Sequence, residues 1–236
     1  MRYPGFISLL FILLVGCAKS EEPIGERTAE WRYFEEEFDA LYVGNGVNVS
    51  ARGLGNDSAS TQIFAYPGDH KNVHTEISGN TLWIDSEEGV FPNMGRRLSL
   101  YPINLLRFNC FGNSDVSLVD MNFSNLSFSI GGSGLVSISG EANSIEGVYS
   151  GENLVNLSGI GSVLSVNHQG EGDFYARYYQ VESCKVEING PGDAYVNVLT
   201  NMTVIFNGTG NVYYTGPVTQ IVAIYNGSGE LIRLPD

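Results

Sequence analysis

The chain has 236 residues, of which 43% are hydrophobic, and its formal net charge is −14 at pH 7. A surface this acidic repels phosphate groups, which argues against nucleic acid and anionic lipid headgroups as partners. The three cysteines have neither the number of a disulfide framework nor the spacing of zinc or iron-sulfur ligands.

Residues 1–16 are predicted to be a secretion signal. Arg2 is followed by an apolar run from Phe6 to Val15, which is too short to span a bilayer permanently. The sequence Leu14-Val15-Gly16-Cys17 resembles the lipobox of bacterial lipoproteins, and the resemblance implies that Cys17 becomes the lipidated first residue of the mature chain. An ordinary signal peptide followed by an incidental cysteine is the alternative.

Residues 17–37 follow as a predicted acidic tether. Positions 18 to 37 contain seven Glu against one Lys and two Arg, a composition typical of flexible or extended chain. The run Lys19–Glu22 is similar to the export signal that places Bacteroidota lipoproteins on the outside of the outer membrane. Ala18 is also not the aspartate that retains lipoproteins in the inner membrane. We therefore expect a lipid anchor in the outer membrane, at the cell surface or alternatively on the periplasmic face.

Residues 38–236 are predicted to form one elongated β domain, because no linker-like composition divides this range. Up to Asn109, short alternating runs end at turn sequences such as Gly44-Asn45-Gly46, which predicts irregular strands. These strands are expected at Phe38–Val43, Val47–Ala51, Thr61–Tyr66, Val73–Ile77 and Thr81–Asp85.

Asp57-Ser58-Ala59 lies between two of these strands and resembles the acceptor triplet for O-glycosylation in Bacteroidota. The resemblance implies a glycan on Ser58, and an unmodified loop is the alternative.

A glycine turn recurs through the second half of the chain at a nearly constant interval. Mostly apolar residues stand two, four and six positions before each glycine and four positions after it, so period-2 strands flank every turn. No segment between the turns shows a helical apolar period, and successive copies must coil directly onto one another. We predict an all-β fold, a single-chain parallel β-helix (β-solenoid) of about seven coils. The repeat glycines are Gly112, Gly132, Gly151, Gly170, Gly190, Gly208 and Gly227.

Three reactive side chains fall in the inward columns of these strands. Cys110 and Cys184 stand four coils apart, roughly 19 Å at one strand spacing per coil, which is too far for a disulfide. We therefore expect two buried free thiols. His168 shares an inward column with Ile130 and Ile188, and we predict a buried, hydrogen-bonded core histidine.

Several segments resemble one known family. Phe38–Val43 with Val47–Val49, and then Ser78–Ile84, resemble the start of the putative auto-transporter adhesin, head GIN domain family. Tyr101–Val116 resembles the entry of that family into its glycine repeats, and the resemblance covers about residues 38 to 234. It implies a right-handed parallel β-helix of the kind found mostly in Bacteroidota lipoproteins and secreted proteins. It implies no catalytic residue.

Tyr175, Tyr195 and Tyr213 stand five positions after successive repeat glycines, on the face opposite the inward columns. They are expected to form three rungs of an outward aromatic ladder. Flat rings with a hydroxyl suit sugar rings and protein partners, because they give large contact area at small entropic loss. We predict these residues as the ligand-binding site, and ordinary packing on a β surface is the alternative.

Asp173 and Asp193 stand three positions after their glycines. Carboxylates one strand spacing apart, about 5 Å, repel each other. A bound Ca²⁺ ion would relieve this repulsion because it prefers oxygen ligands, so the two residues are candidates for a Ca²⁺ site. Solvated turn residues are the alternative, and Leu135 and Leu154 interrupt the column in earlier coils. No cofactor is predicted.

A polysaccharide-cleaving enzyme is the catalytic alternative. β-Helix lyases place calcium-binding acids near an Arg or Lys base, and Arg177 and Lys185 lie in the same stretch as Asp173 and Asp193. The short interval between successive glycines leaves no long loops for a polysaccharide groove. No nucleophile elbow, phosphate-binding loop or zinc-protease helix motif is present. We predict no catalytic residue.

Together these observations predict a non-enzymatic lipoprotein that binds a glycan or a protein along the side of an all-β rod. A structural protein of the cell envelope without a specific soluble ligand is the second interpretation, and the polysaccharide-cleaving enzyme is the third. The sequence leaves the ligand and the oligomeric state open. The last strand, near Leu231–Asp236, has few residues that protect its edge from self-association.

Overall fold

The computed structural model describes residues 26–53, 60–86, 97–101 and 104–235. In these residues the chain forms sixteen β-strands and one 3₁₀ helix, and none of it is a helix long and apolar enough to cross a membrane. The predicted signal peptide, Cys17 and Ser58 lie outside the described residues. The elements are β1 Thr28–Tyr33, β2 Ala40–Val43, β3 Asn48–Arg52, β4 Ser60–Ala65, η1 His70–Asn72, β5 Val73–Ser78, β6 Thr81–Ser86, β7 Arg97–Tyr101, β8 Arg107–Cys110, β9 Val116–Ile130, β10 Leu135–Tyr149, β11 Leu154–His168, β12 Phe174–Ile188, β13 Ala194–Phe206, β14 Val212–Thr215, β15 Gln220–Tyr225 and β16 Leu231–Arg233.

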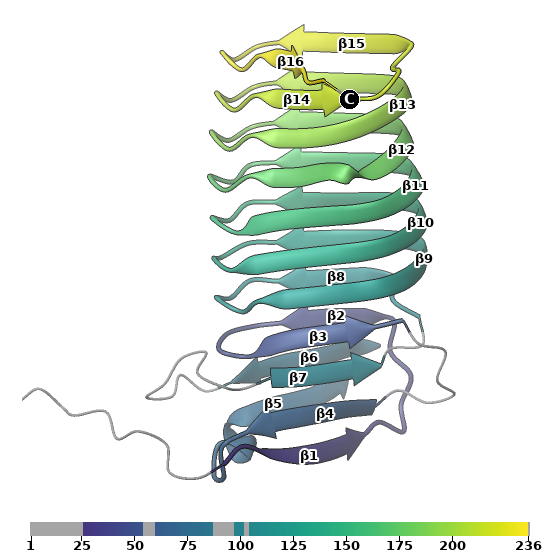
Figure 1. The fold of residues 1–236 in the computed structure, drawn as a ribbon. Coiled ribbons are helices and arrows are strands. Elements are labelled where there is room, and N and C mark those ends of the chain that lie inside the picture. The colour runs from purple at the N-terminus through teal and green to yellow at the C-terminus, as the bar shows by residue number, and fades with distance from the viewer. Residues whose placement is uncertain (1–25, 54–59, 87–96, 102–103, 236) are drawn as a thin grey trace, which may run out of the picture.

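From β9 to β13, each coil is one long strand that crosses the front of the molecule, bends, and returns along the back to a tight turn (Figure 1). The front segments run from the turns to the bend while the chain rises toward its C-terminus, which makes the coil right-handed. Residues one repeat apart lie side by side in parallel register, as Val136 does with Val116 and with Val155. The predicted parallel β-helix is confirmed. The strand after one turn and the strand before the next, expected as two elements, are continuous.

Glycines allow the bend in the middle of β10 and β11. Gly140 and Gly159 have φ angles of +145° and +125°, which residues with a side chain rarely adopt. A Cβ on Gly159 would lie 1.9 Å from the carbonyl oxygen of Gly140. The register between β9 and β10 shifts at the same place, between Ile138 and Gly140, as in a β-bulge. The two halves of one strand can therefore face each other across a core.

The core lies between the front and back halves of the coils. The column four positions after each repeat glycine is at most 1% exposed from Val116 to Val212. Cys110 and Cys184 are buried free thiols, as predicted, and burial raises their pKa to about 11 and about 12. These thiols are therefore protonated at neutral pH and act as small apolar core residues.

His168 is fully buried, and its ring lies against that of Tyr149 with the centroids 4.7 Å apart. The predicted burial is confirmed. Neither ring nitrogen makes a hydrogen bond of normal geometry among the described residues, although the backbone of Asp193 and that of Gly172 lie close enough to favour the charged ring. The neighbours of His168 along the register are Tyr149 and Ile188. Burial lowers the pKa of His168, which keeps the ring neutral at pH 7.

The repeat glycines stack on one another at the tight turns. A Cβ on Gly190 would lie 2.4 Å from the carbonyl oxygen of Gly170, and one on Gly208 would lie 2.3 Å from that of Gly190. A side chain at these positions would push adjacent coils apart. The column extends one coil beyond the predicted glycines, because a Cβ on Gly112 would lie 2.2 Å from the carbonyl oxygen of Gly44.

The N-terminal strands add coils in an order that differs from their order in the sequence. β2 and β3, joined by the Gly44 turn, lie directly below β8 and β9 and pair with them in parallel. β6 and β7 form the next level and pair in parallel with β2 and β3, although they come later in the chain. β5 and β4 then pair antiparallel with β6 and β7, and β1 pairs antiparallel with β4. A reversal of strand direction thus closes this end of the solenoid.

β1 lies within residues 17–37, the segment predicted as a tether. Its six residues all pair with β4. The Arg32 guanidinium also donates hydrogen bonds to the carbonyl oxygens of Val73 (2.7 Å) and His70 (2.9 Å), which ties β1 to the start of β5. The five strands expected in this region occur as β2 to β6, each within two residues of its predicted bounds, whereas β1 and β7 were not predicted.

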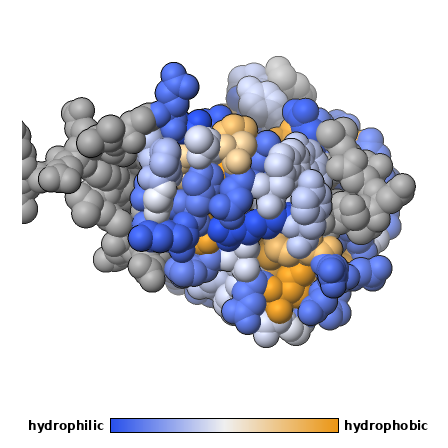
Figure 2. Space-filling view, turned by 90° about the horizontal axis from the view of Figure 1, so that it is seen from below, coloured by the Kyte–Doolittle hydropathy of each residue, from blue (hydrophilic) through white to orange (hydrophobic). Residues whose placement is uncertain are grey.

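Both ends of the solenoid expose large apolar or aromatic side chains, which at the N-terminal end include Trp31 and Tyr33 of β1. Figure 2 looks onto the N-terminal end, where hydrophilic surface predominates and hydrophobic surface forms small areas. At the other end, β15 presents Val222 and Tyr225 with exposed fractions of 54% and 57%. Within the described residues β15 pairs only with β13, so its outer edge has no strand beside it. Self-association along this edge stays a prediction.

Replacing Gly190 with alanine is expected to lower the free energy of unfolding by roughly 2–4 kcal/mol, because the Cβ would collide with the backbone of the coil below. Gly68 is the matched control: its φ is +92°, but nothing lies within 4 Å of an added Cβ. Gly68→Ala should therefore cost only the backbone strain, about 1 kcal/mol. Chemical denaturation followed by circular dichroism measures both variants. Equal losses would contradict the stacking argument.

Candidate functional site

Three tyrosines stack on the front face of the upper coils. Tyr175 of β12, Tyr195 of β13 and Tyr213 of β14 occupy equivalent rungs. The ring centroids are 4.5 Å apart in the lower pair and 4.7 Å apart in the upper pair, with interplanar angles of 7° and 9°. All three side chains are partly exposed. The structure thus brings together the residues predicted as an outward ladder, which we call the tyrosine stack.

Stacking changes what these tyrosines can offer to a ligand. Parallel rings at these distances cover each other's faces, so both faces of Tyr195 are occupied by its neighbours. A sugar ring cannot stack on Tyr195 and meets ring edges and hydroxyl groups instead. Ring faces without a tyrosine neighbour remain at the two ends of the stack. There the next residues along the register are Asn156 below Tyr175 and Ile232 above Tyr213.

Below the tyrosine stack, the same outward column contains small polar side chains. Asn156, Ser137 and Ser117 follow one another down the register. The two serines line a shallow recess of about 270 Å³, which also includes Arg97 and Asp115. The front face therefore steps from a raised aromatic stack to a depression lined by both polar and apolar side chains.

The acidic residues beside the tyrosine stack hold the backbone of the next coil. Asp173 Oδ1 accepts a hydrogen bond from the backbone N–H of Asp193 (3.0 Å), and Asp193 Oδ1 accepts one from that of Asn211 (2.7 Å). Asp173 Oδ2 also accepts a hydrogen bond from the Tyr175 hydroxyl (3.1 Å). These carboxylates therefore have a structural role at the turn. The described part of the chain holds no group of three or more His, Cys, Asp or Glu side chains that could bind a metal ion.

An asparagine ladder follows the tight turns of the upper coils. The side-chain amide of Asn207 donates to Oδ1 of Asn189 (2.9 Å), and that of Asn226 donates to Oδ1 of Asn207 (2.8 Å). The Asn189 amide donates to Asn167 (2.8 Å), although Gln169 holds the position equivalent to Asn189 in the repeat. Each amide links two coils, which is the turn chemistry expected of asparagine here.

The tyrosine stack presents neutral hydroxyl groups. Burial raises the pKa of Tyr195 to about 12, and the neighbouring Tyr175 and the carboxylates of Asp173 and Asp193 add to the rise. Burial also raises the pKa of Tyr175, as does its hydrogen bond to Asp173. At neutral pH these hydroxyls can donate and accept hydrogen bonds, which suits a ligand rich in hydroxyl groups.

The residues considered for polysaccharide cleavage do not converge. Asp173 precedes β12 at the turn, Arg177 lies near the bend, and Lys185 belongs to the second half of β12 on the back of the molecule. The Arg177 guanidinium instead donates a hydrogen bond to the carbonyl oxygen of Pro235 (3.1 Å). These residues form no acid–base pair around a common point.

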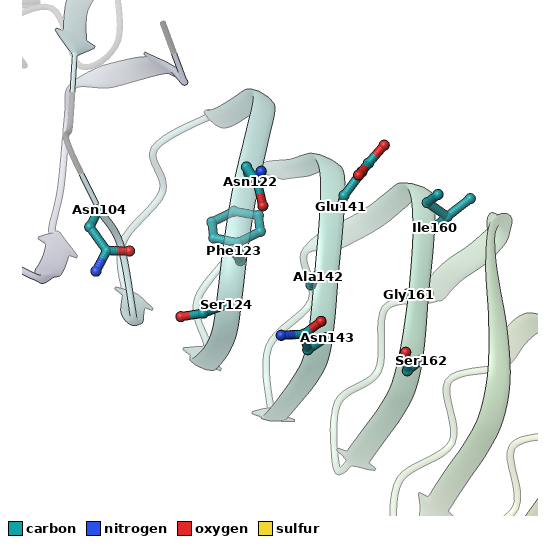
Figure 3. Close-up of a pocket in the computed structure, with 10 residues that line it drawn as sticks. All are labelled: Asn104, Asn122, Phe123, Ser124, Glu141, Ala142, Asn143, Ile160, Gly161 and Ser162. Carbon is teal, nitrogen blue, oxygen red and sulfur yellow. The ribbon is translucent and has the colours of Figure 1, made fainter. Parts of the chain in front are cut away.

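A larger depression, of about 630 Å³, lies at the bend of β9 to β11 (Figure 3). Among its lining residues are Phe123, Ala142 and Gly161, which share one column and shrink from each coil to the next. This loss of side-chain volume was the only sequence signal for the depression, and it was not recognised from the repeat. The polar lining residues are Asn104, Asn122, Ser124, Glu141, Asn143 and Ser162.

Comparison with known proteins gives both a family and a fold. A family model described as "Putative auto-transporter adhesin, head GIN domain" matches residues 37–217. A search of curated proteins finds no match. Among solved structures, the chain is similar to "a putative adhesin" from Bacteroides fragilis, with 17% identity and a TM-score of 0.77 over 90% of this chain and 99% of the other.

Two structures from Parabacteroides distasonis are also similar. A "putative adhesin" has 17% identity and a TM-score of 0.65, over 90% of this chain and 98% of the other. A "Putative lipid binding protein" has 15% identity and a TM-score of 0.58, over 89% of this chain and 98% of the other. At these identities the likeness to solved structures shows the shared fold.

The raised pKa of Tyr195 predicts a pH-dependent stability. Its folded-state pKa of about 12 lies above the ordinary value near 10, so its contribution is complete below about pH 10 and is lost as the pH rises toward about 12. Tyr195→Phe keeps the stacked ring but has no proton to lose. The variant should therefore lose less stability than the wild type across this interval. Thermal unfolding at a series of pH values measures the difference, and parallel losses would contradict it.

Proposed function

This chain belongs to the family described as "Putative auto-transporter adhesin, head GIN domain", and from that membership we propose a non-enzymatic adhesin that binds a glycan or a protein through the side of its solenoid. The tyrosine stack carries the proposal, because it is an outward aromatic surface held on three paired strands. The described residues considered for catalysis do not converge, which favours binding over cleavage.

The tyrosine stack is pre-organised for a repetitive ligand. Its rings repeat every 4.5 to 4.7 Å along the solenoid axis, and each ring is held by its neighbours. A side chain that is already ordered loses little entropy when a ligand binds. Neutral hydroxyls at successive rungs supply several weak hydrogen bonds, which together favour an extended ligand over a small compact one.

The polar column below the tyrosine stack lengthens this surface. A ligand lying along the solenoid axis would pass from the hydroxyls of the stack to Asn156, Ser137 and Ser117 on consecutive coils. The lower face of Tyr175, which has no tyrosine neighbour, would meet it at the step between the two parts. A glycan fits this sequence of groups best, because it combines hydroxyls with apolar C–H faces.

We further propose that a lipid on Cys17 anchors the chain in the outer membrane, with the solenoid at the cell surface. Cys17 precedes β1 in the chain, and β1 lies at the end of the solenoid opposite the tyrosine stack (Figure 1). In the order of strands on the front face β12 is seven strands from β1, about 34 Å at ~4.8 Å per strand. Such an anchor would keep the N-terminal end near the membrane and hold the stack away from it.

The ligand proposal is tested first on a glycan array, with and without Ca²⁺, using the purified mature chain that lacks Cys17. We expect selective binding. For a bound glycan, Tyr195→Ala removes the middle ring and should weaken affinity at least about tenfold. Tyr195→Phe keeps the stack and removes one hydroxyl, so it should weaken affinity by a smaller factor. Isothermal titration calorimetry measures both variants.

Tyr33→Ala is the matched control, because Tyr33 is an exposed tyrosine that also stacks, on Trp31, at the opposite end of the solenoid. It should leave affinity unchanged. Full affinity in both Tyr175→Ala and Tyr195→Ala would mean that binding does not use the tyrosine stack. A blank array would count against a glycan and favour a protein partner or a structural envelope role.

The anchor is tested by cell fractionation. Cys17→Ala removes the only side chain proposed to carry lipid and should move the protein from the membrane fraction to the soluble fraction. Cys184→Ala is the control, since Cys184 is a buried free thiol in the core. A Cys17→Ala protein that stays in the membrane fraction would contradict lipid anchoring at this residue.

A further inference from the structure

The bend of β12 contains a bulge that interrupts the regular stacking. Ala176 pairs with Val196 of β13, and the next paired residue, Gln180, faces Asn197. Residues 177–179 therefore have no register partner in β13. Against β11, on the other side, the register of β12 also shifts at this point. A second shift, between Val181 and Ser183, follows in the pairing with β13, and regular pairing resumes from Ser183 onward.

The bulge leaves two consecutive side chains, Arg177 and Tyr178, on the outside before Tyr179 turns back into the core. Tyr179 is 1% exposed and packs into the core, where a Cβ on Gly161 would lie 2.2 Å from its hydroxyl oxygen. Tyr178 is 81% exposed. Bulges often re-aim side chains beside functional sites. Tyr178 offers a solvent-facing ring, which the tyrosine stack does not have in its middle.

A recess of about 430 Å³ lies beside Tyr178 and is shared by three coils. Among the described residues, its lining includes the cation Arg177 and no Asp or Glu. The depression at the bend of β9 to β11 instead includes Glu141, and the recess below the tyrosine stack includes both Arg97 and Asp115. In a chain with a net charge of −14, the described lining of this recess carries one positive charge and no negative one. Its volume falls in the range of small-ligand sites.

We propose that this bulge recess, defined by Arg177, Tyr178, Gln180, Asn197 and Pro217, binds a saccharide that carries a carboxylate. The inference rests on the proposed function, because it assumes a glycan ligand. It adds to that function a second contact point, on the same coils as the tyrosine stack, and a chemical class of sugar.

Each group in the recess has a defined part in this binding. The ring of Tyr178 is the surface on which the apolar face of a sugar ring stacks. One guanidinium nitrogen of Arg177 donates a hydrogen bond to the carbonyl oxygen of Pro235 (3.1 Å), which orients the guanidinium group. The other N–H groups of the guanidinium are then left to bind a carboxylate. The Asn197 amide nitrogen donates a hydrogen bond to the carbonyl oxygen of Arg177 (3.4 Å), so its oxygen and the amide of Gln180 are the groups offered to sugar hydroxyls.

The test compares uronic acid oligomers with neutral oligomers of the same linkage, using the mature chain that lacks Cys17 and isothermal titration calorimetry. The acidic oligomer should bind at least about tenfold more tightly, and added salt should weaken only that binding. Tyr178→Ala should weaken both sugars about tenfold or more, whereas Tyr178→Phe should bind as the wild type does. Arg177→Gln should remove the preference for the acidic sugar, and Arg177→Lys should keep part of it.

Tyr33→Ala and Arg52→Gln are matched controls, since both alter exposed side chains outside the recess, and both should bind like the wild type. Unchanged melting temperatures establish that the recess variants are folded. Equal binding of acidic and neutral sugars, or wild-type affinity in Tyr178→Ala, overturns the bulge site. In that case, glycan binding that is lost in Tyr195→Ala still supports the proposed function. If no saccharide binds, this inference is overturned, and the proposed function then depends on a protein ligand.

Discussion

Backbone contact at the repeat glycines is the constraint on which the rest of the structure depends. At each tight turn, one coil lies directly on the carbonyl group of the coil below, as Gly190 does on Gly170. The backbone N–H groups of Thr209 and Gly210 in turn donate to the Gly190 carbonyl oxygen, each at 3.2 Å. Because no Cβ intervenes, successive turns stay one strand spacing apart. The strands on both sides of each turn inherit that spacing and keep their register.

Strict register turns single side chains into ladders. The stacked tyrosines, the asparagine amides and the aspartate-to-backbone hydrogen bonds all arise because equivalent positions meet at every coil. Each such contact contributes only about 1 kcal/mol. Repeated over several coils, the contacts order the surface side chains before any ligand arrives. The proposed binding face depends on this order, because it offers the same group again and again along one axis.

Departures from the repeat produce the local surface features that could serve as separate sites. The column that shrinks from Phe123 to Gly161 opens a depression at one bend, and the surplus residues of β12 raise Tyr178 at another. In both cases the register shifts at the bend and regular pairing resumes beyond it, so the irregularity stays local. A regular scaffold can therefore carry chemically different sites on adjacent coils without losing its core.

The sequence by itself determined the coil and its columns. The glycine interval and the period-2 alternation leave one face of each strand for the core, which assigns Val136 and Val155 to the inside and Tyr175, Tyr195 and Tyr213 to one outward column. Only the tertiary structure decided how those rings lie, because ring planes are set by packing against neighbours.

Tertiary structure also decided the order of the N-terminal coils. Gly44 lies under Gly112 although the two glycines are far apart in the chain, and no local pattern specifies such a pairing. The interval from Gly170 to Gly190 exceeds that from Gly190 to Gly208, so the sequence indicates that one coil is longer than the next. It does not indicate where in the coil the extra residues form a bulge, which the strand register shows. Periodicity encodes register within a repeat. Contacts between distant segments decide the order of the coils and the orientation of their side chains. The free energy of such a contact depends on both segments, and the local sequence of one segment does not specify the other.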